Sequence, residues 1–122
     1  MSPESPAPNV HKNIANVLDV KEMHSQEEYF RLVGVPRSSD VMGWMEASEL
    51  LLASLLAYGQ EFLPDSMALR HFSLDLIVGK AQSPVVTLEV DRVSYSERHS
   101  VLEAYLYSDV GAMIAKASAT WS

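Results

Sequence analysis

The fold is decided by residues 40–60, which read DVMGWMEASELLLASLLAYGQ. Within residues 42–58 only two glutamates and two serines are polar. This pattern predicts a long helix that Ser39 or Asp40 would cap and that Gly59 would end near Tyr58. A helix on the surface of a small acidic protein would show a broad polar face. The sequence therefore predicts that other elements surround this helix.

Downstream of this helix the hydrophobic repeat changes from 3.6 residues to 2, the repeat of a strand. Turn sequences separate four such segments, which span residues 71–78, 85–95, 100–108 and 112–121. A further strand is predicted at 29–35, while 11–28 is ambiguous and begins with helical spacing. In the turn SDVG, Gly111 is free to take a positive φ. Short connections favour antiparallel neighbours, so we expect an α+β domain in which one antiparallel sheet wraps around one helix.

The composition excludes several classes of protein. A chain of 122 residues fits one domain, and we assign 1–10, which is rich in proline, to a disordered tail and 11–122 to the domain. The net charge of −7 and the lack of clustered Lys and Arg argue against a nucleic-acid partner. Cysteine is absent, and the histidines show no metal-binding spacing, so we expect no metal and no cofactor. No signal peptide or membrane span is evident, which makes a cytoplasmic protein the default expectation.

The strand half of the chain has a recognisable order of parts. The strand VTLEV (86–90) precedes a polar turn, a further strand and the acidic turn SDVG (108–111), and AMIAKASATW (112–121) is a small-residue strand that ends in an aromatic residue. This order resembles acyl-CoA thioesterase-like domains of the hot-dog fold. The resemblance covers residues 29–121 and is strongest over 67–121.

The resemblance implies a function and an assembly. Such proteins act on acyl thioesters of coenzyme A or of acyl carrier protein. They form homodimers, or dimers of dimers, whose sheets join edge to edge, with the active site between subunits. The start of the central helix polarises the thioester carbonyl, since its free N–H groups and its dipole stabilise negative charge on oxygen. A carboxylate then acts as general base or nucleophile.

Three residues of the predicted helix are the catalytic candidates. Gly43, near the helix start, would let backbone approach the thioester, although it would equally let neighbouring groups pack closely. Glu46 and Glu49 lie three positions apart and share a helix face, so either carboxylate is a candidate base. The same residues also fit a narrow solvated stripe that continues to Ala53 and Gln60. Many relatives carry the acid eight positions beyond the glycine, where this chain has Leu51.

Four further residues are candidates for substrate binding. Met42 and Trp44 would line a tunnel for the acyl chain, and ordinary core packing explains them as well. Asp40 precedes the helix and also fits the N-cap. His71 opens a strand where some relatives carry a polar residue that faces the cleft, and an exposed structural histidine is the alternative.

Three hypotheses follow for function. The first is hydrolysis of an acyl thioester, with the helix start as oxyanion site and Glu46 or Glu49 as base. The second is a non-catalytic protein of the same fold that binds an acyl ligand or stabilises an assembly, because the usual His-Gly pair is absent and position 51 is leucine. The third is a dehydratase or isomerase that acts on thioester intermediates.

Overall fold

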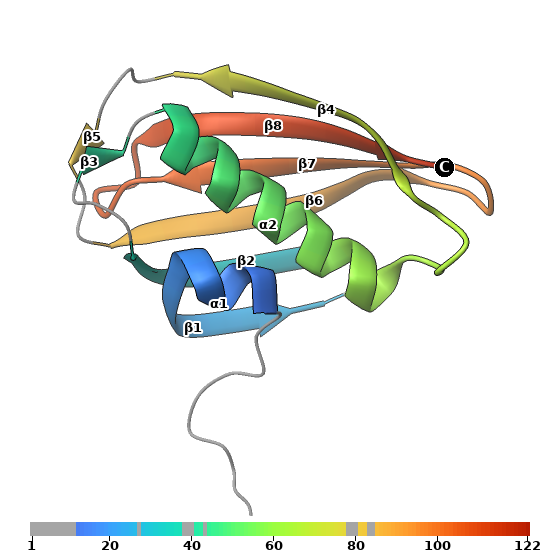
Figure 1. Ribbon diagram of the computed structural model, residues 1–122, viewed down its shortest axis with the longest axis horizontal. Coiled ribbons are helices and arrows are strands. Elements are labelled where there is room, and N and C mark those ends of the chain that lie inside the picture. The colour runs from blue at the N-terminus through green and yellow to red at the C-terminus, as the bar shows by residue number, and fades with distance from the viewer. Residues whose placement is uncertain (1–11, 27, 38–40, 43, 78–80, 83–84) are drawn as a thin grey trace, which may run out of the picture.

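The computed structural model describes residues 12–26, 28–37, 41–42, 44–77, 81–82 and 85–122. A sheet in the order β1-β2-β6-β7-β8-β4, antiparallel throughout, curves around the long helix α2 (Figure 1). The elements are α1 (Lys12–Val17), β1 (Leu18–Ser25), β2 (Tyr29–Pro36), β3 (Val41–Met42), α2 (Trp44–Phe62), β4 (Leu69–Leu76), β5 (Ala81–Gln82), β6 (Val86–Tyr95), β7 (Ser100–Tyr107) and β8 (Met113–Trp121). The α+β architecture predicted from the sequence is confirmed.

Helix α2 forms the centre of the core. Between Ala47 and Gly59 only Glu49 is exposed, and the three half-buried residues are Ser48, Leu52 and Leu56. The inner faces of β2, β6, β7 and β8 supply the opposing buried side chains. Each fully buried leucine contributes about 1.5–3 kcal/mol relative to an exposed one, so burial on nearly all sides stabilises the helix in place.

The predicted ends of the central helix were both wrong. The helix continues through Gly59 to Phe62, and the glycine lies against the indole of Trp121, where the absence of a Cβ permits close packing. A Cβ on Gly59 would come within 3.2 Å of Trp121 Cζ2. At the other end, Met42 is not helical: with Val41 it forms β3, which pairs with β5 in a small second sheet.

The ambiguous N-terminal region contains α1 and a strand that was not predicted. Helix α1 bears out the helical spacing around Ile14, which is fully buried. Strand β1 pairs with β2, and the register shifts by one residue between Val20 and Glu22. This bulge changes which positions face the core, since Leu18 and Val20 pack inward before it and Met23 packs inward after it.

The turn between β7 and β8 has the predicted chemistry. Gly111 has a φ of 83°, a conformation that glycine adopts without the steric cost a Cβ imposes. Its N–H donates to the carbonyl of Ser108 at 3.0 Å, and the Ser108 N–H donates to the carbonyl of Ala112 at 2.8 Å. The prediction of a hairpin at SDVG is confirmed.

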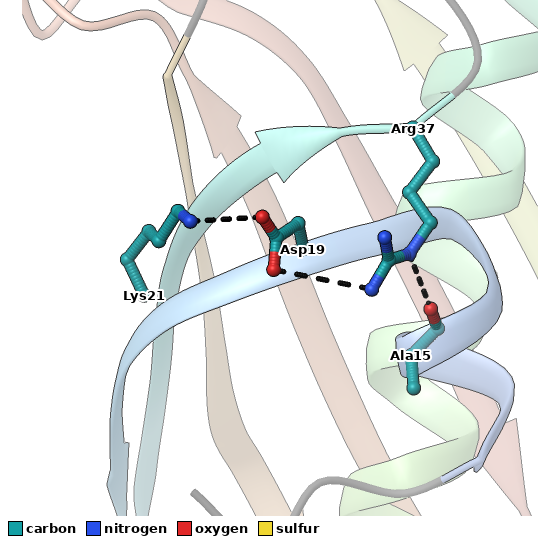
Figure 2. A network of polar contacts seen from close by, with 4 residues as sticks. All are labelled: Ala15, Asp19, Lys21 and Arg37. Carbon is teal, nitrogen blue, oxygen red and sulfur yellow. Dashed lines mark hydrogen bonds and ion pairs between the residues drawn. The ribbon is translucent and has the colours of Figure 1, made fainter. Parts of the chain in front are cut away.

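Arg37 joins the end of β2 to the end of α1 (Figure 2). Its Nε donates to the carbonyl of Ala15 at 2.7 Å, and its backbone N–H donates to the carbonyl of Val17 at 3.0 Å. Asp19 lies between two cations, with Oδ2 2.8 Å from Lys21 Nζ and Oδ1 3.9 Å from Arg37 Nη2. The hydrogen bond from Lys21, followed by the nearby charges, lowers the pKa of Asp19. Arg37 thus satisfies carbonyls that a short helix leaves open at its C-terminus.

Arg37→Met is expected to lower the free energy of unfolding by about 1 kcal/mol, the usual net value of a side-chain hydrogen bond. Methionine keeps the aliphatic stem but loses the donor to the Ala15 carbonyl. Urea unfolding followed by circular dichroism measures the change. The control is Arg98→Met, because Arg98 is exposed in the turn between β6 and β7. Equal effects of the two substitutions would show that the Arg37 contacts do not stabilise the fold.

Candidate active site

A groove lies between α2 and the edge strand β4. Its volume is about 330 Å³, and it is lined by Ser48, Glu49 and Leu52 of α2 and by Phe72 and Leu74 of β4. Because alternate residues of a strand face opposite sides, Phe72 and Leu74 both point toward the helix, where they pack on the core. The groove therefore combines an apolar wall with the one exposed carboxylate in the middle of α2.

The polar side of the groove belongs to the first half of α2. The hydroxyl of Ser48 donates to the carbonyl of Met45 at 2.9 Å, so this side chain is turned back along its own helix. Glu49 follows it and is exposed. A water molecule or a ligand can reach the Glu49 carboxylate at the same place where an apolar group would contact Leu52.

The other predicted catalytic acid has a different environment. Glu46 is half-buried in the first turn of α2, where the helix dipole favours negative charge, and it does not line the groove. The stripe that was expected to run from the two glutamates to Gln60 is interrupted, because Ala53 is buried. Of the two candidates, the structure brings only Glu49 to the groove.

Four of the predicted site residues lie between position 40 and the first residue of α2. Asp40 and Gly43 lie outside the described residues. For Met42 and Trp44 the structure describes the backbone, in β3 and at the first position of α2, while their side chains lie outside the description. The roles of all four in binding or catalysis stay predictions.

His71 lies on the opposite side of the sheet from the groove. It is exposed, pairs with Thr120 of β8 and precedes Phe72, which faces the helix. Alternation along β4 therefore directs His71 to the outer face. The structure does not bring His71 and Glu49 to a common face of this chain, and the substrate-binding role of His71 stays a prediction.

The groove also contains residues that were not singled out from the sequence. Phe72 and Leu74 belong to the strand predicted at 71–78, but a strand pattern does not say what each face of the strand meets. Ser48 and Leu52 carried no distinct signal within an apolar helix. Leu51, which stands at the position where the resemblance implied an acid, is fully buried and belongs to the core.

The described part of the chain shows neither a grouped set of metal ligands nor a membrane-spanning helix. Over the described ranges, no three His, Cys, Asp or Glu side chains are grouped closely enough to hold a metal ion. None of the helices in the described part of the chain has both the length and the hydrophobicity that crossing a membrane requires.

The fold has clear structural relatives, although no protein family and no curated protein matches the sequence. A hypothetical thioesterase from Streptococcus pneumoniae, crystallised with coenzyme A, superposes with a TM-score of 0.69 at 12% identity over 87% of this chain and 84% of that one. A thioesterase from Haemophilus influenzae has a TM-score of 0.70 at 9% identity, over 88% of this chain and 80% of that one. The chain has a hot-dog fold.

A third hot-dog protein extends the comparison. The PaaI protein from the phenylacetic acid degradation operon of E. coli has a TM-score of 0.67 at 6% identity, over 85% of this chain and 81% of that one. The fold resemblance stated from the sequence is thus confirmed. The TM-scores establish the fold, while identities this low carry no information about the chemistry of this chain.

Proposed function

We propose that this hot-dog protein hydrolyses acyl thioesters of coenzyme A or of acyl carrier protein. The observation that carries the proposal is Glu49, whose exposed carboxylate stands at the edge of the apolar groove between α2 and β4. Leu52, Phe72 and Leu74 would contact the acyl chain, and the carboxylate would activate water beside it. The fold shared with a hypothetical thioesterase crystallised with coenzyme A supports this choice of substrate class.

The proposed reaction uses the free N–H groups at the start of α2 as the oxyanion site. Glu49 takes a proton from water, and the resulting hydroxide attacks the thioester carbonyl carbon. The carbonyl oxygen gains negative charge and is stabilised by the helix start, with Gly43 as the predicted closest donor. The C–S bond then breaks, and the proton passes from Glu49 to the leaving thiolate, which gives a carboxylic acid and a free thiol. Glu46 is the alternative base.

A second function is favoured by one specific observation. Leu51 is fully buried, so the position that carries the acid in many relatives is here part of the core. A protein of this fold that holds an acyl ligand without cleaving it would need only the apolar groove. The dehydratase or isomerase hypothesis rests on the fold alone.

The test is a panel of acyl-CoA esters of increasing chain length, with free thiol measured by a chromogenic thiol reagent. We expect thiol release that saturates with substrate concentration. The same esters are tested for ligand-induced thermal stabilisation, which rises with ligand concentration relative to Kd. Stabilisation without thiol release would replace hydrolysis with the binding function, and a change in enoyl absorbance without thiol release would indicate the dehydratase or isomerase.

A further inference from the structure

The groove between α2 and β4 has a polar end and an apolar end. The helix and the strand run in opposite directions (Figure 1), because β4 returns along α2 after a short connection. Leu74 therefore lies nearer to the start of the helix than Phe72 does. On the helix, Ser48 and Glu49 precede Leu52. The polar end thus consists of Ser48, Glu49 and Leu74, and the apolar end consists of Leu52 and Phe72.

The order of these residues gives the groove a direction. From Glu49 to Leu52 the helix advances about 4.5 Å along its axis, and from Leu74 to Phe72 the strand covers about 7 Å. In the proposed reaction the thioester carbonyl lies toward the helix start, beside Glu49. The acyl chain therefore extends from the polar end toward Leu52 and Phe72.

Phe72 is the bulkiest of the described side chains that line the groove. Its cross-strand partner on β8 is Ala119, which is fully buried and adds little bulk. Farther along lie Leu56 of α2 and Leu69 of β4, which are half-buried, pack on the core and do not line the groove. The apolar surface continues past the phenyl ring while the groove does not, so Phe72 stands where the groove ends.

The volume and the lining of the groove restrict the acyl group. At roughly 30 Å³ for each heavy atom, the volume of a water molecule in the liquid, a groove of about 330 Å³ holds about eleven atoms. The sulfur and the oxygen of the thioester occupy part of this space, which leaves about eight to ten carbons. Leu52, Phe72 and Leu74 offer no side-chain hydrogen bond, so a hydroxyl on the far part of the chain would lose its hydrogen bonds to water.

We propose that Phe72 closes the acyl site and makes this protein selective for unsubstituted aliphatic acyl chains of medium length, about eight to ten carbons. The inference rests on the proposed function, because it takes the groove to be the acyl site, and it adds the substrate class and the residue that determines it. Each methylene that enters the groove is expected to raise kcat/KM about four-fold. A chain longer than the groove gains nothing further.

The decisive variant is Phe72→Ala, measured with acyl-CoA esters from butanoyl to hexadecanoyl. The unchanged protein is expected to prefer octanoyl or decanoyl. Removal of the ring opens the groove toward Leu56 and Leu69, so the ratio of kcat/KM for dodecanoyl to that for octanoyl is expected to rise at least ten-fold. The matched control is Leu74→Ala, which removes apolar bulk from the same strand face at the polar end. It is expected to lower kcat/KM for all chains alike and to leave the preferred length unchanged.

Two further measurements test the same end of the groove. Phe72→Trp keeps an aromatic residue on the core and fills more space, so it is expected to move the preference to hexanoyl or shorter chains. This variant serves should Phe72→Ala fail to fold, which circular dichroism detects. The ester of ω-hydroxyoctanoate with coenzyme A is expected to have a kcat/KM at least ten-fold below that of octanoyl-CoA in the unchanged protein.

Binding is measured in parallel by the thermal stabilisation that acyl-CoA thioethers produce, since a thioether cannot be hydrolysed. If the unchanged protein releases no thiol from any ester, hydrolysis is refuted, and the dependence of binding on chain length then decides the role of Phe72. The same length preference in the unchanged protein, Phe72→Ala and Phe72→Trp would overturn the inference while leaving hydrolysis intact. A preference of the unchanged protein for hexadecanoyl would also overturn it, and no stabilisation by any thioether together with no thiol release would refute both.

Discussion

Glu49→Gln is expected to lower the rate of thioester hydrolysis by about 10²–10⁴-fold, the usual contribution of a general base. Glutamine has nearly the same size and keeps an oxygen at the edge of the groove, but it cannot accept a proton from water. KM is expected to change little, because Leu52, Phe72 and Leu74 still contact the acyl chain. Initial rates of thiol release at several substrate concentrations give kcat and KM separately.

The control for this experiment lies on the same helix. Glu61→Gln removes an equal charge near the other end of α2, and glutamine can still accept the hydrogen bond that Ser25 donates to Glu61 at 3.0 Å. Its kcat should equal that of the unchanged protein. Glu46→Gln tests the alternative base. Full activity in both Glu49→Gln and Glu46→Gln would remove the helix carboxylates from the mechanism.

Gly34→Ala is expected to destabilise the protein by about 2–3 kcal/mol, in the range of an overpacked core. An added Cβ would lie 2.5 Å from the carbonyl oxygen of Asp19 and 2.9 Å from Leu18 Cγ. The nearer atom belongs to the backbone of β1, so β1 and β2 would have to move apart where Gly34 pairs with Val20. For a domain with the usual 5–15 kcal/mol of stability, this loss is large. Denaturant unfolding at equal protein concentration measures it.

Gly111→Ala is the matched comparison for that substitution. A Cβ at Gly111 meets no atom within 4 Å, and only its φ of 83° opposes a side chain. We expect a cost of about 1 kcal/mol from the backbone conformation alone. Stability of Gly34→Ala equal to or above that of Gly111→Ala would contradict the close approach of β1 and β2.

The architecture was predictable because most elements have uninterrupted periods. The strands β4, β6, β7 and β8 alternate over most of their length, and the sequences of the polar turns between them disfavour continuation of the strands. Strand β1 escaped prediction because its bulge after Val20 shifts the inward positions from even to odd numbers, which removes the alternation that identifies a strand. Gly59 led to a wrong prediction for a different reason: its local preference favours a helix end, while in the structure it lies inside the helix and packs closely against Trp121.

The candidate site was less predictable than the fold. Glu49 was identified because it is an acid in an apolar helix, a property of the sequence alone. Its neighbours Phe72 and Leu74 come from a strand twenty residues later, and only the three-dimensional arrangement of β4 beside α2 joins them to it. His71 and Phe72 are adjacent in the chain and yet face opposite sides of the sheet, so proximity in sequence was a poor guide to membership of the groove.

The pairing of β4 with β8 has a consequence for biosynthesis. Strand β4 is made directly after α2, but its neighbour in the described sheet, β8, comes only after β5, β6 and β7 have been made. While the ribosome adds those residues, the face of α2 that packs on β6, β7 and β8 remains uncovered, and so do both edges of β4. Exposed apolar surface and unpaired strand edges are what chaperones bind and what aggregation begins from. The nascent chain is therefore most vulnerable between the synthesis of Leu76 and that of Trp121.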